Sequence, residues 1–78
     1  MRTQHEDRMR SLAAVMAPAL TPQAHQDILA YVDAGEWGLA LSDLRDIAIL
    51  EDAAAHRAEA EAIAGAMGIA LLPDTAAG

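Results

Sequence analysis

The stretch YVDAGEWGLALSDL, residues 31–44, decides how this chain folds. An apolar stripe with helical spacing ends at Val32, and Gly35 follows as the residue type that most easily adopts the left-handed conformation at a helix end. A second apolar stripe begins at Trp37, only two residues later. Such a short connection predicts two helices that meet at a tight corner over residues 33–37.

On both sides of this corner, apolar residues recur at three- and four-residue spacing, in four segments altogether. This spacing predicts an all-α fold. Thr3 and Glu6 have the spacing of a capping box, and Pro18 should end the first helix. Thr21 should cap the second helix, with Pro22 at its first position. The residues expected to face inward are Met9, Leu12, Ala13 and Met16; His25, Ile28, Leu29 and Val32; Trp37, Ala40, Leu41, Leu44 and Ala48; and Ala55, Ala62, Ile63, Ala66 and Met67.

The division between the third and fourth helices is less marked, because no strong helix breaker lies between them. We expect the break near residues 50–54, with Asp52 as a possible cap. The fourth helix should cover residues 53–67 and end at Gly68. The sequence therefore predicts a small bundle of about four helices, with the tight corner between helices two and three.

The chain is long enough for one domain. Residues 1–72 are expected to form this single helical domain, with Ile69, Leu71 and Leu72 folded back over one end of the bundle. Residues 73–78 are expected to be a disordered tail.

Composition excludes several classes of function. The chain contains no cysteine, so thiolate chemistry and disulfides are excluded. No apolar run approaches the roughly 20 residues of a membrane span, and the first residues do not resemble a secretion signal. We therefore expect a cytoplasmic protein that has no membrane partner.

The charge is strongly negative, with a formal net value of −7 and no lysine. Nine carboxylates lie between Asp27 and Glu61 against only Arg45 and Arg57, and this excess equals the whole net charge. A glycine corner between two helices is also found in helix-turn-helix proteins, but an acidic second helix would repel DNA phosphates. The charge favours a basic protein partner over nucleic acid, and the alternative is an acidic surface that only keeps the protein soluble.

No catalytic or metal-binding pattern is present. The three histidines, His5, His25 and His56, have no second ligand at a metal-binding spacing. Asp27 and Asp33 lie in a predicted helix and not in a calcium-binding loop. We expect neither a cofactor nor enzymatic activity.

The outer side of the third helix is the most informative surface. At about 100° per residue, Leu39, Ile49 and Leu50 point away from the stripe that starts at Trp37, among acidic residues. Apolar side chains set among carboxylates suit an interface with a basic partner; alternatively, the third helix is central and buries both faces. The predicted partner-binding residues are Asp33, Glu36, Leu39, Asp43, Asp46, Leu50 and Glu51.

Residues 31–44 also resemble the MafI family of immunity proteins from bacterial polymorphic-toxin systems. The likeness lies in an aromatic residue, a Gly-Glu-aromatic corner, an Ala-Leu pair and a further leucine, and it extends to Glu51 and to the closing segment AGAMGI, residues 64–69. It covers roughly residues 25–70, whereas the alanine-rich fourth helix departs from the family. The resemblance implies a cytoplasmic protein that neutralises a cognate toxin domain, for example a nuclease with a basic groove. The alternative is a small helical adapter or oligomerisation module without an antitoxic role.

Overall fold

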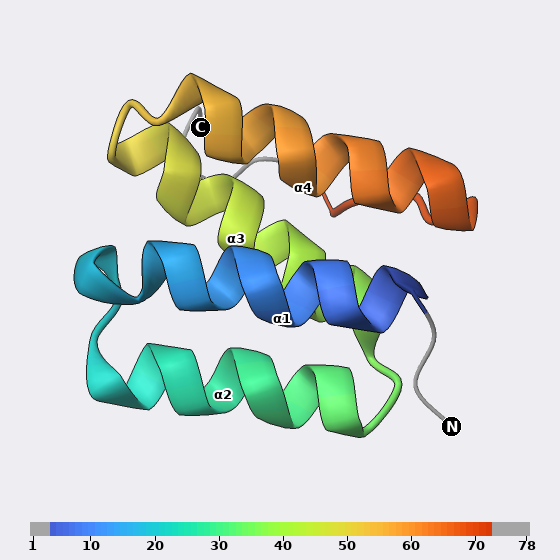
Figure 1. Cartoon of the computed structure of the whole chain (residues 1–78), viewed down its shortest axis with the longest axis horizontal. Coiled ribbons are helices and arrows are strands. Elements are labelled where there is room, and N and C mark those ends of the chain that lie inside the picture. Colours follow the sequence, from blue (N-terminus) through green and yellow to red (C-terminus); the bar gives the residue numbers. More distant parts are fainter. Residues whose placement is uncertain (1–3, 73–78) are drawn as a thin grey trace.

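The computed structural model describes residues 4–72, and within this range the chain forms four α-helices and no strand (Figure 1). This arrangement confirms the predicted all-α fold. The elements are α1 (Gln4–Met16), the short 3₁₀ helix η1 (Ala17–Ala19), α2 (Pro22–Asp33), α3 (Trp37–Leu50) and α4 (Ala54–Met67). The Thr3 cap and the tail at residues 73–78 lie outside the described residues.

The helices form a small bundle with extents of 35 × 27 × 19 Å. In Figure 1, α1, α2 and α4 run across the view in roughly the same orientation, while α3 crosses obliquely behind α1. The most extensive packing is between α3 and α4, followed by α2 against α3 and by α1 against α4 and α2. None of the helices within residues 4–72 has both the length and the hydropathy that crossing a membrane requires.

The first two helices follow their sequence signals closely. The whole predicted stripe of α1 is buried, and α1 ends at Met16, two residues before Pro18. The Oγ1 atom of Thr21 accepts a hydrogen bond from the N–H of Ala24 at 3.1 Å, which is the predicted cap. Of the predicted α2 stripe, Ile28 and Val32 are buried and the other two members are half-buried.

The corner between α2 and α3 is closed by a Schellman motif. The N–H of Glu36 donates to the carbonyl oxygen of Tyr31 at 2.8 Å, and the N–H of Gly35 donates to that of Val32 at 3.2 Å. Gly35 has a φ of 77°, in the left-handed region that a side chain disfavours. The predicted tight corner is confirmed, and α3 begins at Trp37.

The break between α3 and α4 falls within the predicted range, but Asp52 plays a different role from the one expected. It does not cap α4, which begins after Ala53 without a side-chain cap. Instead Asp52 has a φ of 54° and closes the end of α3, with the Ala53 N–H donating to the Ala48 carbonyl oxygen at 2.8 Å. Aspartate tolerates the left-handed conformation better than most residues, so it replaces glycine here.

The rotation of α4 differs from the prediction. Its buried residues are Ala60, Ile63 and Ala64. The inward positions predicted for Ala55, Ala62 and Ala66 are wrong, because all three are exposed. Alanines occur on every side of this helix, so their spacing cannot fix which side packs. Ile63, which the prediction placed correctly, decides the orientation, and the two alanines beside it permit close approach to α3.

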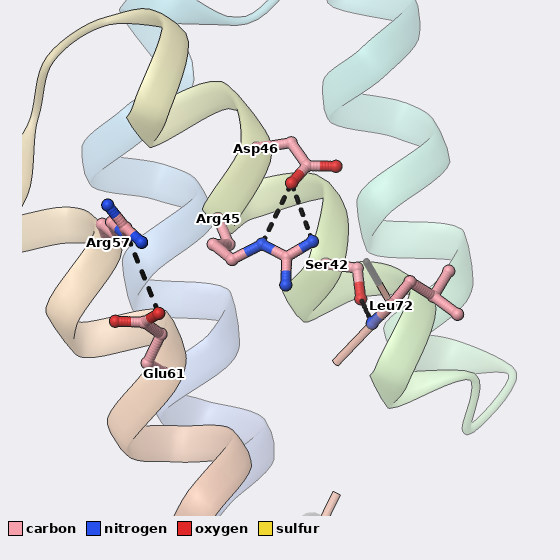
Figure 2. Close-up of polar contacts among 6 residues, drawn as sticks. All are labelled: Ser42, Arg45, Asp46, Arg57, Glu61 and Leu72. Carbon is pink, nitrogen blue, oxygen red and sulfur yellow. Dashed lines mark hydrogen bonds and ion pairs between the residues drawn. The ribbon is translucent and has the colours of Figure 1, made fainter. Parts of the chain in front are cut away.

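The segment after α4 folds back along α3. Gly68 has a φ of 69° and ends α4 as predicted. Ile69 and Leu71 pack against the core, whereas Leu72 remains 51% exposed. The N–H of Leu72 donates to Oγ of the buried Ser42 at 3.0 Å, as Figure 2 shows. This contact fixes the segment beside the start of α3.

Candidate protein-binding surface

Ion pairing divides the nine carboxylates from Asp27 to Glu61 into two groups. Each of the four arginines within residues 4–72 pairs with one carboxylate, and the pairs are Arg8–Glu59, Arg10–Asp33, Arg45–Asp46 and Arg57–Glu61. No ion pair is formed, within the same range, by Asp27, Glu36, Asp43, Glu51 and Asp52. The unneutralised charge of this second group therefore lies on α2, on α3 and at the turn that follows α3.

Asp46, a predicted contact residue, is already engaged inside the fold by Arg45. The side chain of Arg45 is only 9% exposed, and its Nε donates to Oδ1 of Asp46 at 3.0 Å (Figure 2). Its Nη2 lies 2.8 Å from the same oxygen, although without hydrogen-bond alignment. A buried guanidinium requires a counter-charge. Asp46 supplies it and is correspondingly less available to a partner.

Asp33 is also engaged, since its Oδ1 accepts a hydrogen bond from Nη2 of Arg10. This pair links α1 to the end of α2 at an exposed position. The carboxylate of Asp33 raises the pKa of Arg10 above its usual range, chiefly through the hydrogen bond. Two of the five carboxylates predicted to contact a partner are thus neutralised within the chain.

Asp43, in contrast, has no ion-pair partner within residues 4–72. Partial burial raises the pKa of Asp43 above its ordinary value, and the negative charges of Asp46 and Asp27 raise it further. Asp27 comes from α2 and was not among the predicted contact residues, because spacing along α3 cannot reveal a neighbour on another helix. A cation placed beside Asp43 would relieve this repulsion.

The two leucines predicted to point away from the core are both exposed, Leu39 by 37% and Leu50 by 73%. The alternative in which α3 buries them is therefore wrong. They are 11 residues apart on α3, which corresponds to about 16 Å along its axis. Ile49, predicted to lie with them, is half-buried.

The start of α3 and the returning C-terminal segment enclose a hollow of about 340 Å³, which we name the corner groove. The side chains that line it are Glu36, Trp37, Leu39, Ile69 and Leu72. Only Glu36 and Leu39 were predicted as contact residues. Trp37 was predicted to face inward and not to contact a partner. The contribution of Ile69 and Leu72 depends on how residues 69–72 fold back, and the only signal in the sequence was their apolar character after Gly68.

A second hollow, of about 400 Å³, lies between α1 and α4, and we name it the α1–α4 groove. Its lining includes the buried Leu12, the exposed Val15, and His56. Arg8 and Glu59 cross it with two hydrogen bonds, Nε to Oε2 at 3.3 Å and Nη2 to Oε1 at 3.1 Å. None of its residues was predicted to contact a partner.

Apart from Asp33, which ends α2, the predicted contact residues form a stripe along α3 and not one compact patch. Glu36 and Leu39 lie at the corner groove, and Asp43 follows one turn farther along. Leu50 and Glu51 lie at the other end of the helix. A partner that contacts the whole stripe has to follow the length of α3.

No group of three or more His, Asp or Glu side chains within residues 4–72 is arranged to hold a metal ion. The Nδ1 atom of His5 is buried without a hydrogen-bond partner, but no second ligand accompanies it. No protein-family model matches this sequence, and no curated protein or solved structure is significantly similar to it.

Proposed function

We propose that this chain is an immunity protein that binds and neutralises a bacterial toxin domain in the cytoplasm, and that the exposed side of α3 is its binding surface. The observation that carries the proposal is the combination of unpaired carboxylates and exposed leucines along this one helix. The resemblance of residues 31–44 to the MafI family supports the choice of an immunity protein among protein-binding functions.

The charge suggests what the partner presents. Glu36, Asp43 and Glu51 follow the stripe without internal counter-ions. Such a surface attracts a basic partner and accelerates its association at low salt. A toxin that cleaves nucleic acid has a basic substrate groove, so the same charge would serve both partner selection and occlusion of the toxic site.

The test is a co-expression rescue. The gene beside this one is expressed in bacteria with and without the chain, and growth is recorded together with recovery of a complex. We expect growth arrest that the chain relieves and a toxin that co-purifies with it. Growth arrest without rescue, or a harmless neighbour, would contradict the proposal.

A matched pair of variants links the rescue to the proposed surface. Asp43→Lys changes the charge on α3 by two units, and the double variant Ala58→Lys/Ala62→Lys makes the same total change at exposed positions of α4. Rescue should weaken in the first variant and persist in the second. Equal loss in both would indicate that only net charge matters, and equal rescue would place the interface elsewhere.

The exposed leucines also favour a second candidate, a helical adapter that associates with copies of itself. Self-association through Leu39 or Leu50 would bring two sets of unpaired carboxylates together, and this repulsion makes it the weaker candidate. Light scattering over a range of concentrations distinguishes the two. A mass that rises with concentration and falls in Leu50→Ser would support the adapter.

A further inference from the structure

The corner groove combines a fixed apolar wall with exposed apolar side chains. Trp37 and Ile69 line it and pack against the hydrophobic core, so their positions are determined by the fold. Leu39 and Leu72 line the same hollow but stay 37% and 51% exposed. Its volume of about 340 Å³ lies at the lower end of the range of about 300–1,000 Å³ found for ligand pockets. A hollow of this size accommodates one or two large side chains of a partner.

The charge around the corner groove selects the kind of partner. Glu36 lines the groove, and Asp43 lies four residues beyond Leu39, or about 6 Å along α3. Neither carboxylate has an ion-pair partner within residues 4–72, and no arginine lines the groove. A second copy of this chain would present the same charges and be repelled, whereas a cationic segment would be attracted.

We propose that the corner groove is an anchor pocket for a partner segment that carries one large apolar side chain flanked by lysine or arginine. The apolar side chain enters between Leu39 and Leu72 against the ring of Trp37, and the cations reach Glu36 on one side and Asp43 on the other. The inference rests on the proposed function only in requiring a protein partner. It adds the chemistry of the contact and the role of residues 69–72, which complete the pocket.

The test uses the full chain and a random 12-residue peptide library displayed on phage. Peptides are selected on the immobilised protein and counter-selected on the double variant Leu39→Ser/Leu72→Ser, which should keep the fold because both side chains are partly exposed. Selected peptides should contain a large apolar residue near lysine or arginine. Their affinity should fall at least tenfold in the double variant and remain unchanged in Val15→Ser, which replaces an exposed apolar side chain in the α1–α4 groove.

Trp37 can report peptide binding at the corner groove, because it is the only tryptophan in the chain. Its indole Nε1 is buried without a hydrogen-bond partner, and its single N–H resonance should shift when a selected peptide binds. Peptides without a basic bias, an indole resonance that does not move, or an unchanged affinity in the double variant would each overturn the inference. Dimerisation in place of peptide binding would overturn it as well.

The rescue experiment separates this inference from the proposed function. If a toxin is neutralised equally well by Leu39→Ser/Leu72→Ser, the anchor pocket is wrong and the immunity function stands. If basic peptides require the corner groove but no neighbouring toxin is neutralised, the anchor pocket stands and its partner belongs to another system.

Discussion

The corner groove and the α1–α4 groove are similar in size, about 340 and 400 Å³, but they differ in how their charged side chains are paired. In the α1–α4 groove, Glu59 already accepts two hydrogen bonds from Arg8, and Leu12 is buried. In the corner groove, Glu36 has no ion-pair partner within residues 4–72, and Leu39 is partly exposed.

This difference shows that the size of a hollow says little about its role. A ligand in the α1–α4 groove would have to compete with an existing ion pair, while a cationic partner at the corner groove would find unpaired carboxylates. We therefore assign the α1–α4 groove to helix packing and keep the corner groove as part of the proposed binding surface. Four experiments test this distinction.

The largest difference in stability between the two grooves should appear when one leucine of each is replaced by alanine. Leu12→Ala removes a side chain that is only 5% exposed and should lower the free energy of unfolding by about 2–3 kcal/mol. Leu39→Ala should cost less than about 0.5 kcal/mol, as for most exposed positions. Urea denaturation of both variants measures the difference, and equal losses would show that Leu39 belongs to the core.

Charge reversal should change the affinity for a basic partner beside the corner groove but not at the α1–α4 groove. Asp43→Lys should lower the affinity for a basic partner about tenfold, or about 1.4 kcal/mol. Glu59→Lys should leave this affinity nearly unchanged. Titration calorimetry with a peptide selected on the corner groove is the measurement, repeated at higher salt. A loss of affinity in Glu59→Lys but not in Asp43→Lys would reverse the assignment of the two grooves.

The ion pair across the α1–α4 groove should make a smaller contribution to stability. Its side chains are 34% and 41% exposed, so a double-mutant cycle with Arg8→Ala and Glu59→Ala should give a coupling of about 0.5–1 kcal/mol. Glu36→Ala, the comparable change at the corner groove, should have almost no effect on stability. A marked destabilisation by Glu36→Ala would reveal an internal role for that carboxylate.

The smallest expected effect is a gain in stability from neutralising Asp43. Its pKa in the folded state is raised above the ordinary value of 3.8, so the folded state holds the proton more tightly than the unfolded state. The contribution of Asp43 is therefore most favourable below that ordinary value and is lost as the pH rises through the raised pKa. Asp43→Asn should be more stable than the wild type at pH 7 by only about 0.3 kcal/mol, because solvent screens the charge of this exposed side chain.

The pH dependence provides the control for that small gain. In thermal melts at decreasing pH, the advantage of Asp43→Asn should shrink and disappear below about 3.8, where both states of the wild type carry the proton. An advantage that persists in acid would have to come from packing and not from charge.

Local rules in the sequence were sufficient for most of the fold. Thr21 with Pro22 and the left-handed Gly35 each act within a few residues, so the start of α2 and its sharp end could be predicted. The rotation of α4 could not, because its alanines leave the side chain of Ile63 as almost the only directional information. The position of Asp52 was correct, but its backbone role was not.

The candidate surface was predictable only in part, for a related reason. Leu39 and Asp43 lie on the same side of one helix, and helical spacing is enough to place them. The pairing of Asp33 with Arg10 and the contact between Leu72 and Ser42 join residues 23 and 30 positions apart. Contacts of that kind depend on how the helices pack, and no spacing rule along the chain specifies them.

The alanine-rich contact side of α4 has a consequence for how the molecule moves. Ile63 is the one large, fully buried side chain that holds this helix, which also lacks a side-chain cap at its start and contains Gly65. The free energy needed to detach α4 should therefore be lower than that of global unfolding. Amide hydrogen exchange should be faster in α4 than in α3.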